Sequence, residues 1–241
     1  MKKGYKLPLR LETVASFVTP GNILVDVGCD HGYLSISLVK RGLIPRAIAS
    51  DVRPGPLMRA KEHILECALQ DKIEARLSDG LDRILPGEGQ TLVIAGMGGP
   101  LMERILRKDP PKSRSFRELI LEPQSDLPHF RRFLLDHAYS IIDEELVMEE
   151  GKFYPVIKAV PLKAGSEEAY SPAEYAFGRI LIRKCHPALL EFLEKELEIR
   201  ERIMEKLSVS SGAEAGRRKE QVKKEREWIL ETIDRCRNGS L

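Results

Sequence analysis

The chain has 241 residues, of which 42% are hydrophobic and 32% are charged, enough for one α/β domain with an appendage or for two small domains. Its formal net charge is only +2, which excludes a polycationic nucleic-acid binder, so any basic surface must be local. The four cysteines are far apart and form no CxxC pair, which favours neither a disulfide framework nor a metal site. No segment approaches the ~20 apolar residues of a membrane span, so we expect a cytoplasmic protein.

Up to about residue 162, short apolar runs alternate with amphipathic stretches. In chain order we expect a helix at 10–18, a strand at 23–27, a helix at 34–41, a strand at 47–50, a helix at 55–69 and a strand at 73–77. There follow a strand at 91–95, a helix at 101–106, a loop at 109–112, a strand at 118–121, a helix at 127–138 and an antiparallel pair at 140–148 and 153–161. Nearly continuous apolar strands separated by helices predict a parallel sheet covered on both faces.

Within the helix at 55–69, the pattern predicts an inner face made of Met58, Ile64, Leu65 and Leu69. After residue 163 the character of the chain changes, and residues 165–168 with Ser171-Pro172 are expected to form a linker. We therefore predict two domains, residues 1–163 and residues 164–241.

The second domain shows a helical pattern with no strand signal. A mostly apolar seam from His186 to Leu207 steps by alternating fours and threes, with one basic interruption at Arg200. The same stepping runs from Val222 to Cys236 after a polar turn at 208–216. Two such seams predict an antiparallel coiled-coil hairpin. Basic and acidic residues are equally numerous here, so the hairpin is no polycation. A dimerisation or packing element and an arm that grips a large substrate remain equally open.

The most informative segment is the turn Gly28-Cys29-Asp30-His31-Gly32, which joins the first strand to the next helix. A strand, a glycine turn, a helix and an acid about 20 residues further on are typical of a sheet that binds an adenosine cofactor. A pyrophosphate-binding loop has glycine where this chain has Asp30, whose carboxylate would repel phosphate. The carboxylate tolerates the sulfonium and the amino group of S-adenosylmethionine far better, which makes that molecule the expected cofactor.

Acidic residues also follow the second and third strands. Asp51 can accept hydrogen bonds from both ribose hydroxyls, and Asp79 in Ser78-Asp79-Gly80 follows the third strand, where the adenine ring is expected. Each Asp alone could simply cap a turn or helix, and Arg53 alone could indicate NADP. Three acids at three successive strand ends favour the cofactor site.

Two further turns follow the fourth and fifth strands. Three of the four residues in Gly96-Met97-Gly98-Gly99 are glycines, which indicates backbone that closely approaches a planar substrate or moves on binding. Glu122-Pro123-Gln124-Ser125 adds polar groups to the same edge. We interpret Gln124 and Ser125 as a helix cap rather than as substrate ligands.

These motifs together resemble the bacterial tRNA (adenine-22-N1)-methyltransferases, the TrmK group. The resemblance rests on residues 10–15, on 26–34, on Ser78-Asp79-Gly80-Leu81, on 95–99 and on Leu121-Glu122-Pro123-Gln124, and it covers the whole chain, including the C-terminal hairpin. It implies a Rossmann-like class I methyltransferase domain, S-adenosylmethionine as cofactor, and methyl transfer to N1 of adenine 22 in tRNA.

The resemblance also implies roles for single residues. The cofactor would contact Asp26, Gly28, Asp30, His31, Gly32, Asp51, Asp79, Gly80 and Gly96. The substrate would contact Arg10, Met97, Gly98 and Gly99, and we expect Asp30 to be catalytic, beside the adenine that gains positive charge. The expected partner is tRNA, bound by the basic N-terminus and by the runs at 217–219 and 223–224. No protein partner is indicated, and a monomer fits the sequence.

The sequence leaves three other functions to consider. A Rossmann oxidoreductase is disfavoured because the loop is not G-x-G-x-x-G. A non-catalytic module that binds a partner through the hairpin is disfavoured by the acids at the three strand ends. Only the resemblance to the tRNA methyltransferases argues against a methyltransferase that acts on a small molecule.

Overall fold

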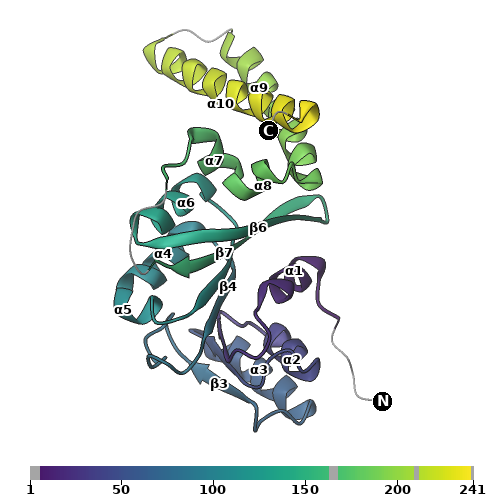
Figure 1. Cartoon of the computed structure of the whole chain (residues 1–241), viewed down its shortest axis with the longest axis vertical. Helices are drawn as coiled ribbons and strands as arrows, with labels where there is room; N and C mark the ends of the chain where they lie inside the picture. The colour runs from purple at the N-terminus through teal and green to yellow at the C-terminus, as the bar shows by residue number, and fades with distance from the viewer. Residues whose placement is uncertain (1–5, 163–167, 209–211, 240–241) are drawn as a thin grey trace. The chain divides into compact units, whose positions relative to one another are not determined.

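The computed structural model describes residues 6–162, 168–208 and 212–239, and Figure 1 shows the course of the chain. The chain divides into two compact units, Met1–Glu167 and Glu168–Leu241. The predicted domain boundary at 163/164 falls outside the described residues.

The first unit is built on a seven-stranded sheet with the order β3-β2-β1-β4-β5-β7-β6. The strands are β1 (Leu24–Val27), β2 (Ala47–Asp51), β3 (Ile73–Leu77), β4 (Thr91–Met97), β5 (Glu118–Pro123), β6 (Tyr139–Glu149) and β7 (Lys152–Pro161). Strands β1 to β5 are parallel, whereas β7 runs antiparallel to both of its neighbours. The predicted strands and the terminal antiparallel pair are confirmed.

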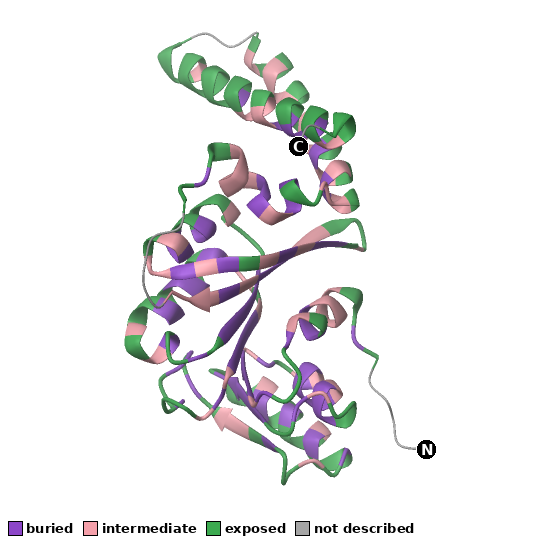
Figure 2. Cartoon of the chain, in the orientation of Figure 1, coloured by how far each residue is buried: buried purple, intermediate pink, exposed green. Residues whose placement is uncertain are grey.

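Helices cover both faces of this sheet, with α1, α2 and α3 on one face and α4, α5 and α6 on the other (Figure 1). They are α1 (Leu9–Phe17), α2 (Tyr33–Lys40), α3 (Pro54–Glu66), α4 (Gly99–Lys108), α5 (Pro110–Ser113) and α6 (Leu127–Asp136). Every residue of β1, β2 and β5 is buried, as Figure 2 shows for the centre of the unit. Burial on both faces explains why most residues of these strands are apolar. The exceptions are Ser50 and the buried acids Asp26, Asp51, Glu118 and Glu122.

The predicted inner face of α3 is wrong in part. Met58 and Leu65 are 61% and 66% exposed, whereas Leu57, Ala60 and Ile64 are buried. The small Ala60 decides the orientation, because a Cβ on Gly32 would lie only 3.2 Å from the Ala60 Cβ. The helix thus packs closely on the glycine turn and leaves larger side chains in solvent.

The segment predicted as a loop at 109–112 contains the short helix α5. Asp109 caps this helix, since its side chain accepts a hydrogen bond from the Lys112 N–H, and Pro110 occupies the first helical position. An Asp followed by Pro is a helix-start signal.

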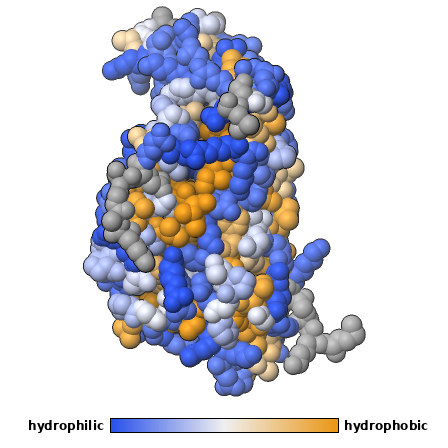
Figure 3. All heavy atoms as spheres, viewed as in Figure 1, coloured by the Kyte–Doolittle hydropathy of each residue, from blue (hydrophilic) through white to orange (hydrophobic). Residues whose placement is uncertain are grey.

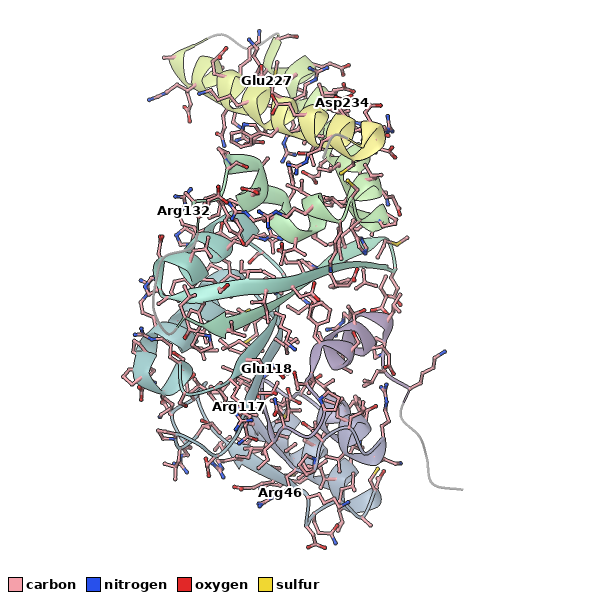
Figure 4. The ribbon with its side chains drawn as sticks, in the orientation of Figure 1. Arg46, Arg117, Glu118, Arg132, Glu227 and Asp234 are labelled. Atoms are coloured by element: carbon pink, nitrogen blue, oxygen red, sulfur yellow. The ribbon has the colours of Figure 1, made fainter. Side chains whose placement is uncertain are left out.

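At the amino end of β5, Glu118 connects this strand to neighbouring segments of the chain. Its carboxylate accepts hydrogen bonds from the Thr19 hydroxyl (2.6 Å) and the Thr91 hydroxyl (2.6 Å), and it pairs with Lys158 (2.7 Å). Burial alone would raise the pKa of Glu118, but these hydrogen bonds together lower it. Figure 4 labels Glu118 and Arg117, together with Arg46 beside the start of β2. The candidate functional site lies at the opposite edge of the sheet, where the parallel strands end.

The second unit contains the helices α7 (Pro172–Phe177), α8 (Arg179–Arg183), α9 (Pro187–Ser208) and α10 (Ala213–Asn238). Residues 165–167 of the expected linker are not described. Its other element, Ser171-Pro172, instead starts α7: the Ser171 hydroxyl accepts from the Glu174 N–H, and the Glu174 carboxylate accepts from the Ser171 N–H. This is the capping box that S-x-x-E encodes.

Helices α9 and α10 pack against each other as an antiparallel hairpin, as predicted. Early positions of α9 pair with late positions of α10, since Glu194 bonds Arg237 (2.6 Å) and Arg200 bonds Glu225 (2.6 Å). The seam buries Leu193, Val222 and Ile229. In the view of Figure 3 the surface of these helices is largely hydrophilic. Their exposed side chains include Glu227 and Asp234, which Figure 4 labels on α10.

Candidate cofactor and acceptor site

A cavity of about 610 Å³ lies where the parallel strands β1 to β4 end. Its size is in the range of small-molecule sites. Ten of the predicted site residues line it, namely Arg10, Asp26, Gly28, Asp30, His31, Asp51, Asp79, Gly80, Gly96 and Met97. Gly32, Gly98 and Gly99 are not among the lining residues. The structure therefore brings together side chains that lie up to 87 residues apart in the sequence (Arg10 and Met97).

The turn after β1 depends on left-handed backbone. Gly28, Asp30 and Gly32 have φ values of 75°, 49° and 73°. Asp is one of the few residues besides glycine that adopt this region readily. A side chain at position 28 would also meet the Met97 Cε, since a Cβ there would lie 2.2 Å from it. The turn thus exposes the Asp30 side chain, which is 62% accessible, at the cavity.

His31 is held by an aromatic stack. Its ring lies 5.4 Å from the ring of Tyr33 and 5.8 Å from that of His63, and the His63 Nδ1 lies 3.0 Å from the His31 carbonyl oxygen. The sequence does not indicate a role for His63, because the helical pattern around it does not show which residues it contacts in the fold. The stack fixes the conformation of the turn.

Cys29 in the same turn is buried, and burial raises the pKa of its thiol. The thiol therefore stays protonated at neutral pH, as expected for a packing residue and not for a nucleophile.

Two carboxylates lie side by side at the ends of β1 and β2. Asp26 and Asp51 are each only 4% exposed. The Ser35 hydroxyl donates to Asp26 (2.9 Å), and the Arg53 N–H donates to Asp51 (2.8 Å). Burial raises the pKa of Asp26 to about 6, the Ser35 hydrogen bond opposes this, and the charge of Asp51 adds to it. A cationic ligand would relieve this electrostatic strain.

We expect Asp26→Asn to stabilise the ligand-free protein in a pH-dependent way. A raised folded-state pKa means that the stability conferred by the protonated Asp26 is complete below the unfolded value near 3.8 and is lost as the pH rises through about 6. The pKa shift corresponds to about 3 kcal/mol of unfolding free energy, which the native protein loses as the pH rises and the amide variant does not. Urea unfolding of both proteins from pH 4 to 8 should show their difference growing with pH. A pH-independent difference would contradict the raised pKa.

Asp79 and Gly80 form the cavity wall beyond β3. Gly80 has φ 55°, and a Cβ there would lie 3.0 Å from the Ile105 Cγ2, so the turn needs glycine to pack on α4. The buried Ser78 hydroxyl donates to the Gly80 carbonyl (3.0 Å) and accepts from the Arg83 N–H (3.1 Å). The turn is thereby fixed with the half-exposed Asp79 carboxylate beside the cavity.

The glycines after β4 divide into two groups. Gly96, with φ 76°, lines the cavity together with Met97. Gly98 and Gly99 instead begin α4 and pack on the next turn, since Cβ atoms there would lie 2.8 Å from the Ser125 Oγ and 2.7 Å from the Ser125 carbonyl oxygen. Close packing thus explains these two glycines. The expectation that they border the acceptor stays a prediction.

The turn after β5 differs from the sequence interpretation. Asp126, not Gln124 or Ser125, stands at the start of α6, and no side chain caps that helix. Gln124 lines the cavity. Beside it, the fully buried Glu122 pairs with Arg10 (3.3 Å) from α1. Burial raises the pKa of Glu122, while Arg10, the Gly96 N–H and the Gln124 side chain lower it.

The sequence did not indicate several other lining residues. Among them, Val52 and Leu101 are large apolar side chains that are 56% and 37% exposed. Arg104 lines the cavity and an adjoining groove, and it makes no ion pair with another described residue. Helical spacing from Leu101 could have indicated Arg104, because residues three apart share a face.

The fold and the site define a class of protein. Residues 7–157 match the family model described as "Methyltransferase domain". The strand order, the glycine turn and the carboxylates after β1, β2 and β3 agree with a class I methyltransferase that uses S-adenosylmethionine. Within the described residues no helix is long and apolar enough to span a membrane, and no group of three or more residues is arranged to hold a metal ion.

Similarity to known proteins identifies the family within this class. The chain is 32% identical to the tRNA (adenine(22)-N(1))-methyltransferase of Bacillus subtilis (strain 168) over 95% of its own length and 98% of the relative's. The crystal structure of the B. subtilis M1A22 tRNA methyltransferase TrmK matches with a TM-score of 0.85 at 31% identity, over 95% of this chain and 99% of the other. Streptococcus pneumoniae Sp1610 in complex with S-adenosyl-L-methionine matches with a TM-score of 0.84 at 33% identity, over 95% and 100%. The chain belongs to the tRNA (adenine(22)-N(1))-methyltransferase family.

Proposed function

We propose that this protein transfers the methyl group of S-adenosylmethionine to N1 of adenine 22 in tRNA, in the cytoplasm. The observation that carries the proposal is a single cavity that joins the carboxylates after β1, β2 and β3 to the turns after β4 and β5. The first group suits the cofactor and the second lies beside it, where an acceptor base has to enter. The activity of the B. subtilis relative supports the choice of acceptor.

The cofactor residues suit the chemistry of S-adenosylmethionine. When bound, this cofactor supplies an electrophilic methyl group on a sulfonium. We assign its methionine end, which carries the ammonium and sulfonium charges, to Asp26 and the turn at 28–32, its ribose to Asp51, and its adenine to Asp79 and Gly80. The buried pair Asp26 and Asp51 gains from a positive ligand, because ionised carboxylates are costly in a dry site.

The reaction needs no covalent enzyme intermediate. Adenine N1 has an in-plane lone pair, and alignment of two bound reactants can supply about 7–11 kcal/mol of the barrier reduction. The methyl carbon would form its bond to N1 as its bond to the sulfonium sulfur breaks, so that a neutral thioether, S-adenosylhomocysteine, would leave and the adenine ring would become cationic. We propose that the Asp30 carboxylate, exposed at the cavity, stabilises this developing charge.

Adenine 22 has to leave the folded body of tRNA to reach the cavity, and unstacking a base costs a few kcal/mol. We propose that residues 164–241 form a domain that offsets this cost by binding tRNA. Arg217, Lys219, Lys223 and Lys224 on α10 are exposed and make no ion pair with another described residue. Lys6 and Arg10 would contribute from the N-terminus, whereas Lys2 and Lys3 lie outside the described residues.

The decisive experiment maps the methylated nucleoside. Unmodified tRNA that carries adenine 22 is incubated with S-adenosylmethionine with and without the protein, digested and examined by mass spectrometry. We expect 1-methyladenosine at position 22 only when the protein is present. Methylation of another nucleoside, or none, would refute the proposal, and transfer to a small molecule instead would favour the alternative acceptor class.

A further inference from the structure

Gln124 is the one side-chain amide among the described residues that line the cavity. Its backbone is anchored to β4, since its N–H donates to the Met97 carbonyl (2.9 Å). Its side chain and that of Arg10 converge over Gly96: a Cβ at Gly96 would lie 3.8 Å from the Gln124 Nε2 and 3.9 Å from the Arg10 Nη1. The absence of a side chain at Gly96 therefore leaves the amide open to the cavity.

Glu122 lies behind this amide and limits how it can turn. The carboxyl group is fully buried and bonds Arg10 (3.3 Å). Burial raises the pKa of Glu122, and the nearby Arg10 and Gln124 side chains oppose this rise. A carboxylate only accepts hydrogen bonds, so it favours the orientation in which the Gln124 NH₂ faces it. The second N–H and the carbonyl oxygen of Gln124 remain available to a ligand.

Sheet order places this amide on the acceptor side. Asp30 follows β1 and Gln124 follows β5, and β4 lies between those two strands. A base that enters above Gly96 and Met97 therefore has the cofactor turn on one side and Gln124 on the other.

Methylation at N1 restricts how the base can be recognised. The N1 lone pair has to face the methyl group, so a protein side chain cannot occupy it. The neighbouring edge of adenine presents a donor at N6 and an acceptor at N7, which a glutamine amide matches with its own oxygen and NH₂. Guanine presents two acceptors there, O6 and N7, and a single amide cannot satisfy both.

We propose that Gln124 binds the N6–N7 edge of the target adenine and thereby selects adenine while leaving N1 free, with Glu122 as the residue that orients the amide. This inference rests on the proposed function and assigns the base-recognition element of that same site.

The test combines a variant with a substrate analogue. Gln124→Leu and the native protein are assayed on tRNA with adenosine 22 and on the same tRNA with 7-deazaadenosine 22, which lacks the N7 acceptor. We expect kcat/KM of the native protein to fall roughly 10-fold on the analogue. Gln124→Leu should show a fall of 10-fold or more on normal tRNA and little further loss on the analogue.

Two further variants separate recognition from structure. Gln70→Leu removes an exposed amide outside the cavity and should behave like the native protein on both substrates. Glu122→Gln keeps the shape of the side chain but also offers donors to Gln124, so it should shrink the native penalty for 7-deazaadenosine. A merely structural role of Glu122 would leave that ratio unchanged. Calorimetry should give S-adenosylmethionine affinities within about twofold of native for Gln124→Leu.

The inference is overturned if Gln124→Leu discriminates against 7-deazaadenosine as strongly as the native protein does, or if its main loss is in cofactor affinity. In either case a native protein that methylates adenine 22 leaves the proposed function intact. A native protein that fails on adenosine 22 itself overturns both.

Discussion

Replacing Asp30 by Asn is expected to slow methyl transfer by roughly 100- to 1000-fold, the range found when a group that stabilises transition-state charge is removed. The substitution removes a charge that lies 3.6 Å from the His31 Nε2 and keeps the shape of the side chain. Asn adopts left-handed backbone as readily as Asp, so the φ of 49° is no obstacle. Because the Asp30 side chain is 62% exposed, no buried partner is lost. The single-turnover rate at saturating tRNA and cofactor measures the effect.

The chain offers a matched control for this variant. Asp126 is also exposed and also has left-handed backbone, with φ 56°, but it does not line the cavity. Asp126→Asn should retain the native rate, and Asp30→Asn should retain cofactor affinity within a few-fold. If the Asp30 variant lost rate and cofactor affinity equally, Asp30 would be a structural residue of the turn.

Neutralising three exposed basic residues of α10 should weaken tRNA binding on the order of 100-fold at 150 mM salt, because each lost phosphate contact removes the release of one counterion. The variant changes Arg217, Lys219 and Lys224 to Gln in the full-length chain. Its affinity should also depend less steeply on salt than that of the native protein. Binding is measured at several salt concentrations, and cofactor affinity should stay unchanged.

A control with the same change in net charge lies at the amino edge of the sheet. Arg46, Lys72 and Arg117 are exposed and immediately precede β2, β3 and β5, opposite the cavity; Figure 4 labels two of them. Changing all three to Gln should alter tRNA affinity far less. Equal losses in both triple variants would mean that only total charge matters and would contradict a binding role for the second unit.

The strands and the edge of the sheet that holds the cavity can be predicted from the local sequence. Apolar runs such as 91–95 are long enough to predict strands, and parallel strands bring their final residues to one edge. The orientation of α3 depends on tertiary packing, which the local sequence does not show. The small Ala60 faces inward because it meets Gly32, so the buried face of α3 contains Leu57 and Ile64 and leaves Met58 and Leu65 outside.

Two helix starts lie in segments whose proline content predicts loop. Asp109 before Pro110, and Ser171 three residues before Glu174, are both capping signals, and in the structure each begins a helix. Gln124 was missed for another reason. A polar residue before a helix is compatible with capping, and only the structure shows that the helix starts at Asp126 and that the amide is free to face the cavity.

The buried Asp26 has a further consequence for how the cofactor binds. A carboxyl group with a pKa of about 6 is about half protonated at pH 6 in the empty protein. A cationic ligand lowers that pKa, so binding should expel about half a proton at this pH and almost none above pH 8. The heat of binding should therefore depend on the ionisation enthalpy of the buffer near pH 6, and the Asp26→Asn variant should lose this dependence. The cofactor and the proton thus compete for one carboxylate.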